Sequence, residues 1–79
     1  MWDIAEARQA ARNLAALLNA AETDEQARQL VADYNAILRT LPSITRAAFV
    51  NEFAMLASPK ALARFFHVTA AEQDERAER

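Results

Sequence analysis

The chain contains no glycine among its 79 residues, yet it carries several of the sequence signals that start helices. Asp3, Thr23 and Thr69 each precede a glutamate or glutamine by three residues, which is the spacing of a capping box. In that motif the side-chain oxygen of the first residue accepts a hydrogen bond from a free backbone N–H of the first helical turn. The acid or amide side chain three residues later accepts the backbone N–H of the first residue in return. Ser58 precedes Pro59, and proline is favoured at the first position of a helix. The sequence therefore predicts an all-α fold.

Apolar residues repeat at alternating spacings of three and four along the first half of the chain. One stripe, within residues 4–20, consists of Ile4, Ala7, Ala11, Leu14 and Leu18. A matched stripe, within residues 24–40 and the residue that follows, consists of Ala27, Leu30, Tyr34, Ile37 and Leu41. This spacing places each set on one face of a helix. Because the two helices are separated by a break near residues 21–23, we expect them to form an antiparallel hairpin.

The third helix, predicted over residues 44–57, is apolar on nearly all sides. On a helical wheel its apolar residues form two opposite groups, one of Phe49, Phe53 and Leu56, the other of Ile44, Ala48 and Met55. Such helices are normally buried on more than one face. A short fourth helix is predicted over residues 59–66, followed by an acidic tail over residues 70–79 that frays. The expected architecture is a small bundle of four to five short helices in a single domain, residues 1–79.

A domain of this size is usually not stable through its hydrophobic core alone. It buries only roughly 60–65% of the surface of its unfolded chain, and small domains usually add disulfides, metals or oligomerisation. The chain has no cysteine and a single histidine, His67, which excludes disulfides and argues against a structural zinc site. We therefore expect a homodimer or assembly on another protein, with no metal and no cofactor.

The phenylalanines suggest where such an interface would lie. All four fall within residues 49–66, and the chain has only 22 apolar residues larger than alanine, of which the hairpin stripes use about ten. The third helix then has more apolar perimeter than the hairpin covers, and aromatic residues dominate the binding energy of interfaces. The predicted partner or dimer interface consists of Phe49, Phe53, Leu56, Phe65 and Phe66. The alternative is that the phenylalanines fill the core between the third and fourth helices.

The net charge of −2 conceals an uneven distribution. Residues 34–68 carry four bases and one acid, whereas residues 1–33 have a net charge of −3 and residues 69–79 of −2. One interpretation is charge balance between solvated faces. The other is an electrostatic patch for an acidic partner, made by Arg46, Lys60 and Arg64. A net charge of +3 is small for nucleic acid, which normally requires several phosphate contacts, so a DNA partner is not expected.

Few residues are available for chemistry. There is no cysteine nucleophile and no glycine-rich loop that would hold a phosphate. Ser43 and Ser58 occupy positions typical of helix caps. Glu52, the only acid of the third helix, is expected to face solvent or to pair with an arginine, and His67 to lie at the end of the fourth helix. The sequence predicts no catalytic, cofactor-binding or metal site, and we expect that the protein is not an enzyme.

A local resemblance suggests an alternative function. Residues 62–69, Leu-Ala-Arg-Phe-Phe-His-Val-Thr, resemble the "LA…GV(S/T)" stretch of bacterial helix-turn-helix domains, in which a helix ends in a tight turn before the recognition helix. His67 takes the place of the family's usual glycine, and the following residues 70–77 are acidic, which opposes contact with phosphates. The resemblance implies a small transcriptional regulator with a degenerate helix-turn-helix over residues 59–77.

The leading prediction is a non-catalytic protein–protein interaction module, a small adaptor or inhibitor that binds a larger bacterial protein. No apolar run, residues 14–18 included, is longer than five residues, far short of the roughly 20 residues of a membrane span, and the start of the chain lacks the features of a signal peptide. We therefore expect a cytoplasmic protein without a membrane partner. Twenty alanines, and eight arginines against one lysine, are typical of a high-GC bacterial or phage genome.

Overall fold

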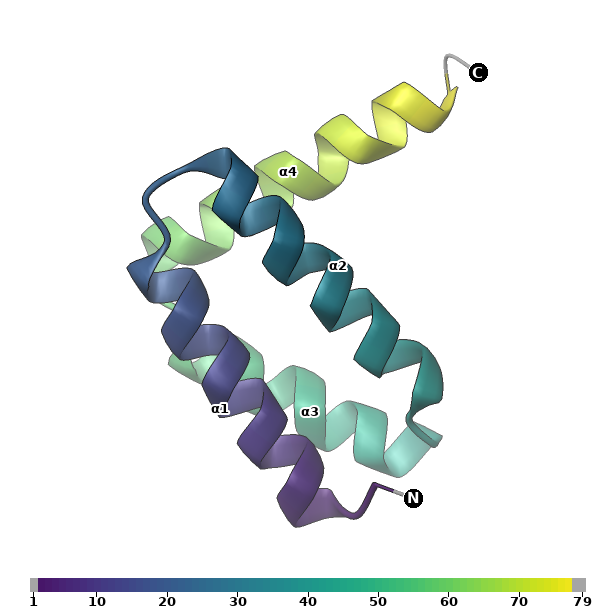
Figure 1. Ribbon diagram of the computed structural model, residues 1–79. Coiled ribbons are helices and arrows are strands. Elements are labelled where there is room, and N and C mark those ends of the chain that lie inside the picture. Colours follow the sequence, from purple (N-terminus) through teal and green to yellow (C-terminus); the bar gives the residue numbers. More distant parts are fainter. Residues whose placement is uncertain (1, 78–79) are drawn as a thin grey trace.

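The computed structural model describes the backbone of residues 2–77 and the side chains of residues 2–71. Within these residues the chain forms four helices and no strand (Figure 1): α1 (Ile4–Ala20), α2 (Asp24–Thr40), α3 (Ser43–Leu56) and α4 (Pro59–Ala77). The predicted all-α fold is confirmed. The ranges of α1 and α2 coincide with the first two predicted helices, and α3 begins and ends one residue earlier than predicted.

Local hydrogen bonds explain where three of the helices begin. The Asp3 carboxylate accepts a backbone N–H of the first turn of α1 at 2.7 Å. At α2 the Thr23 hydroxyl accepts the N–H of Gln26 at 3.2 Å, and the Gln26 side chain accepts the N–H of Thr23 at 3.3 Å, which completes a capping box. Ser58 caps α4 by accepting a backbone N–H at 3.1 Å. These boundaries are therefore set by residues close together in the sequence.

The start of α3 does not follow this pattern. The sequence predicts a cap at Ser43, but Ser43 is the first helical residue and Pro42 precedes it without a side-chain cap hydrogen bond. The Pro42 carbonyl accepts the N–H of Arg46 at 2.7 Å, so the first turn is closed by backbone alone.

α4 does not end at residue 66, as the sequence predicts, but continues to Ala77. The Thr69 hydroxyl, predicted to cap a new helix, donates instead to the Phe65 carbonyl at 2.9 Å within α4. The turn implied by the helix-turn-helix resemblance does not occur in this part of the chain, and that expectation is wrong. The segment predicted as a fraying tail is helical as far as Ala77, and its residues 78–79 lie outside the described residues.

Burial explains why α4 continues past His67. Ala61 and Val68 are only 5% and 2% exposed, and Phe65 between them is partly buried. Their spacings of four and three place them on one helix face, so a turn at His67 would take Val68 out of the core. Among the described residues none has a positive φ, which is the usual backbone state of the residue that ends a helix at a tight turn.

The four helices form two layers (Figure 1). α1 and α2 lie in one layer and run in opposite directions, while α3 crosses behind α1 and α4 crosses behind α2. α1 packs mainly against α3, and α2 mainly against α4, whereas α1 and α2 contact each other little. The predicted antiparallel hairpin of α1 and α2 is therefore not confirmed. The result is a flat molecule, with principal extents of 36 × 28 × 16 Å.

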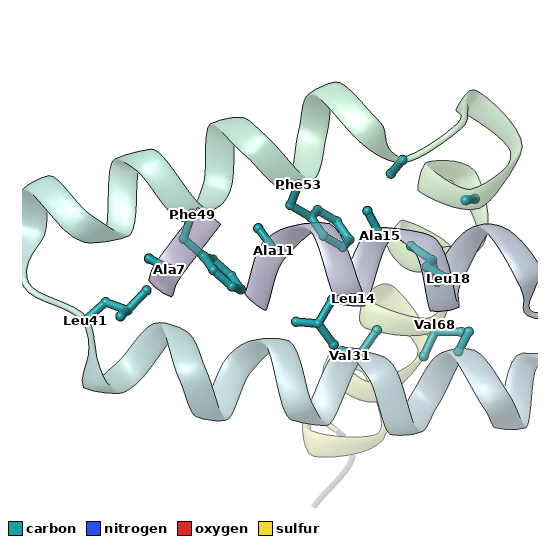
Figure 2. Packing of buried hydrophobic residues seen from close by; sticks show 13 residues of the cluster. Ala7, Ala11, Leu14, Ala15, Leu18, Val31, Leu41, Phe49, Phe53 and Val68 are labelled. Atoms are coloured by element: carbon teal, nitrogen blue, oxygen red, sulfur yellow. The ribbon is translucent and has the colours of Figure 1, made fainter. Parts of the chain in front are cut away.

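α1 approaches α3 closely because its buried face is made of small side chains. Ala7, Ala11 and Ala15 are fully buried at successive turns of α1. Figure 2 shows Phe49 and Phe53 extending from α3 into the space beside these alanines. Two large aromatic rings thus fill the volume that the small residues of α1 leave open, as close packing of the interior requires.

Tyr34 of α2 connects the two layers. Its ring centroid lies 5.1 Å from that of Phe49, 4.8 Å from that of Phe53 and 5.1 Å from that of Phe65. These distances are typical of attractive aromatic pairs. We call these four residues the aromatic cluster. Burial raises the pKa of Tyr34, because the phenolate would lose its hydration.

Two polar contacts position α3 and α4 relative to α1. Arg12 Nε lies 2.9 Å from Glu52 Oε1, an ion pair that joins α1 to α3. The Asn19 side chain accepts the N–H of Ser58 at 2.8 Å and donates to the Leu56 carbonyl at 3.0 Å. A single side chain of α1 therefore holds the connection between α3 and α4.

Candidate functional site

The structure divides the predicted aromatic interface between core and surface. Phe49 and Phe53 are 0% and 4% exposed, so they are core residues, and a partner cannot reach them in this fold. Phe65 is partly buried in the aromatic cluster. Leu56 and Phe66 are exposed, at 45% and 63%. The predicted interface therefore needs correction: the small side chains of α1 leave room for the phenylalanines of α3, which the fold uses as its own core.

The side of α3 that faces away from the core carries an uncharged surface, which we call the outer α3 face. Its members are Ile44, Ala47, Val50, Asn51, Ala54 and Met55. All six are exposed, and none of them is charged. Ile44 is 75% exposed and Met55 80%, the largest values among the large apolar side chains of the described residues. Exposed apolar patches of this kind commonly mark interaction sites.

Both charged residues of α3 form contacts with other parts of the chain and lie outside the outer α3 face. Glu52 pairs with Arg12 of α1, and the Glu52 side chain is only 19% exposed. Arg46 Nη2 donates to the Leu41 carbonyl at 3.1 Å. The arrangement leaves the outer α3 face without a charge of its own, although Arg46 and Glu52 border it.

Phe66 belongs to a smaller apolar area on α4. Ala63 and Ala70 lie about one turn to either side of it and are also exposed. Lys60 and His67 lie on the adjoining side of the same helix and are exposed as well. This area has fewer exposed apolar side chains than the outer α3 face, so it is the weaker candidate for an apolar contact.

The predicted electrostatic patch is not a single surface. Arg64 Nη1 donates to the Ala21 carbonyl at 2.9 Å, and Arg64 Nε lies 3.9 Å from Asp24 Oδ1. Arg46 lies in the first turn of α3, about 15 Å along that helix from the connection to α4, where Lys60 and Arg64 are found. The structure therefore separates Arg46 from the other two residues and uses both arginines for contacts within the fold.

A second candidate surface lies between α1 and α2. It consists of two open hollows, of about 340 Å³ and about 350 Å³. The first is lined by Leu17, Ala20, Ala21, Gln26, Gln29 and Leu30. The second is lined by Ala10, Asn13, Leu14, Asp33, Ala36 and Ile37. Because both hollows are bordered by the same two helices, we call them together the α1/α2 groove. Sequence reasoning missed this groove entirely.

The described residues bring few reactive side chains together. His67 Nε2 lies 3.9 Å from Asp24 Oδ2, and both side chains are exposed. Within the described part of the chain, no three His, Asp or Glu side chains are grouped as metal ligands would be.

No helix found in the described residues combines the length and the apolar character needed to cross a membrane.

Part of the outer α3 face is visible in the sequence. The helical wheel already separates Ile44 and Met55 from Phe49 and Phe53. The sequence predicts the interface on the side of the two phenylalanines because aromatic residues dominate interfaces, but that side is the core. The groove leaves no comparable signal, because Leu17 looks like one more member of the apolar stripe of α1. Only its exposure in the folded chain distinguishes it.

Comparison of the chain with family models, curated proteins and solved structures finds no match.

Proposed function

We propose that the chain is a non-catalytic protein–protein interaction module, a small adaptor or inhibitor of a larger bacterial protein, which pairs with a second copy through the outer α3 face. The observation that carries this proposal is the exposure of Ile44 and Met55 on a helix face without any charged residue. Covering such a surface removes apolar area from water and is therefore favourable.

A two-fold pair of antiparallel α3 helices fits the order of residues on this face. A two-fold interface uses the same patch on both copies, so Ile44 of one copy would meet Met55 of the second. Ala47 and Ala54 are small and would let the two helix axes approach closely. Asn51, near the middle of the helix, would lie close to its own counterpart and form a hydrogen bond across the axis.

The size of the face indicates that the dimer is weak. α3 has 14 residues and is about 21 Å long, so one helix per copy covers less than the roughly 800 Å² per partner of a standard interface. We expect dissociation in the micromolar range. A larger partner protein that binds the same face would then replace the second copy.

Two complementary charge variants test this arrangement. Ile44→Asp and Met55→Lys each place a charge at the helix end where the dipole favours it, so neither is expected to unfold the monomer. Light scattering at tens to hundreds of micromolar should show a dimer for the wild type and monomers for each variant alone. An equimolar mixture of the two variants should regain dimer, because the new carboxylate and the new amine then face each other.

Ile4→Asp is the matched control, since Ile4 also lies in the first turn of a helix and is exposed, at 41%, but is not part of the outer α3 face. This variant should remain dimeric. If Phe66→Gln dissociates the dimer and Ile44→Asp does not, the interface lies on α4 instead. A wild-type chain that stays monomeric would contradict self-association and assign the face to another protein.

A further inference from the structure

The α1/α2 groove has the length and register of a site for a third helix. Because α1 and α2 run in opposite directions, Ala10 shares one hollow with Ile37, and Leu17 shares the next with Leu30. The hollows therefore follow one another along the same pair of helices. Between residues 10 and 20 α1 rises about 15 Å, or nearly three turns. A docked helix of this length presents apolar anchors at i, i+3 or i+4, and i+7.

Leu17 is the apolar side chain that the fold leaves uncovered in this groove. It is 57% exposed, whereas the adjacent Leu18 is 1% exposed and Leu30 and Ile37 are partly buried. Leu17 lies about 160° around α1 from Asn19, the residue that holds the α3–α4 connection. It therefore points away from the second layer of the molecule, and burying it requires a further chain.

Acidic side chains predominate around the groove, and among the described residues the one basic group in contact with its lining, Arg64, donates to the Ala21 carbonyl and lies 3.9 Å from Asp24 Oδ1. Asp33 lines the groove, Glu22 directly follows Ala21, which also lines it, and Glu6 lies one turn before the groove on the same face of α1. No arginine or lysine lines either hollow in the described part of the chain. Arg12 lies on the other side of α1 and is paired with Glu52. A ligand that matches this surface carries positive charge beside an apolar stripe.

We propose that the α1/α2 groove binds an amphipathic helix of a partner protein, with an apolar stripe against Leu17, Leu30 and Ile37 and with lysine or arginine on its flanks. An extended segment would fit less well, because both walls of the groove are helices whose backbone groups are already hydrogen-bonded, whereas a helix satisfies its own. The inference extends the proposed interaction function to a second surface, which does not depend on the α3 dimer.

A pair of labelled synthetic helices provides the probe. Both are 18-residue peptides with the same leucine stripe at helical spacing, one with lysine flanks and the other with glutamate flanks. Fluorescence anisotropy should show that the lysine peptide binds in the micromolar range. The glutamate peptide should bind at least about fivefold more weakly at ~50 mM salt, because charge attraction is little screened there.

Matched substitutions locate the binding site. Leu17→Gln should weaken binding of the lysine peptide by about tenfold, the effect expected for loss of most of one buried leucine. Asp33→Asn should weaken it a few-fold, whereas Asp24→Asn, the same change on the opposite side of α2, should not. Amide chemical shifts of the labelled protein should change along residues 10–37 rather than 44–55. Equal binding of both peptides, equal binding by Leu17→Gln and wild type, or no binding at all would overturn the inference.

The outcome is separable from that of the dimer test. Ile44→Asp should bind the lysine peptide as the wild type does, and Leu17→Gln should dimerise as the wild type does. Loss of peptide binding in Ile44→Asp would show that the peptide uses the outer α3 face and would overturn the groove assignment. Loss of the dimer in Leu17→Gln would instead contradict the α3 interface.

Discussion

Tyr34 is the residue whose place in the core has the clearest consequence in solution. Burial in the aromatic cluster raises its pKa above the ordinary value near 10. Because the folded-state pKa is the higher one, the native protein holds the phenol proton more tightly than the unfolded chain does. This contribution to stability is complete below about pH 10 and is lost as the pH rises through the raised value.

We therefore predict that the free energy of unfolding falls as the pH rises above about 10, and that Tyr34→Phe removes part of this fall. Urea unfolding followed by circular dichroism measures both. Because Tyr34 is the only tyrosine, its absorbance change on ionisation reports its pKa directly. An ordinary pKa, together with parallel pH profiles for the two proteins, would contradict the burial of this ring.

At the scale of elements, α4 gives the sharpest test, because the structure makes one helix where the sequence suggests a turn. His67 lies inside α4 and is exposed. His67→Gly should therefore be less stable than His67→Ala by about 1 kcal/mol, since glycine loses more backbone entropy in a helix. Both variants lose the same contact with Asp24, so their difference isolates the backbone. Urea unfolding provides the measurement. Greater stability of the glycine variant would indicate a left-handed turn at this position.

At the scale of the whole molecule, the structure separates the basic residues of the predicted electrostatic patch. Arg46 and Arg64 bond backbone carbonyls in separate parts of the fold. We expect no shift of duplex DNA at ~150 mM salt, and at most weak binding without sequence preference near ~20 mM, where few phosphates would be neutralised. A gel-shift titration over salt concentration tests this. A tight, sequence-specific complex at physiological salt would restore the transcriptional-regulator alternative.

The sequence by itself determines the fold class and where three of the helices begin. Asp3, Thr23 and Ser58 act on backbone groups only a few residues away, so no knowledge of the rest of the chain is needed to place them. The apolar stripes of α1 and α2 are local in the same sense. The far end of α4 is not, because it depends on the burial of Val68 by the other helices.

Only the tertiary structure decides which apolar side chains become core. Both sides of α3 are apolar, so periodicity cannot choose between Phe49 and Ile44 as the buried residue. The choice is made by the neighbours of α3: the small residues of α1 admit large rings, and Tyr34 of α2 packs against those rings. Likewise Leu17 continues an apolar stripe yet remains exposed. Burial depends on the shape and distance of a second helix, which the spacing of residues along the first one does not contain.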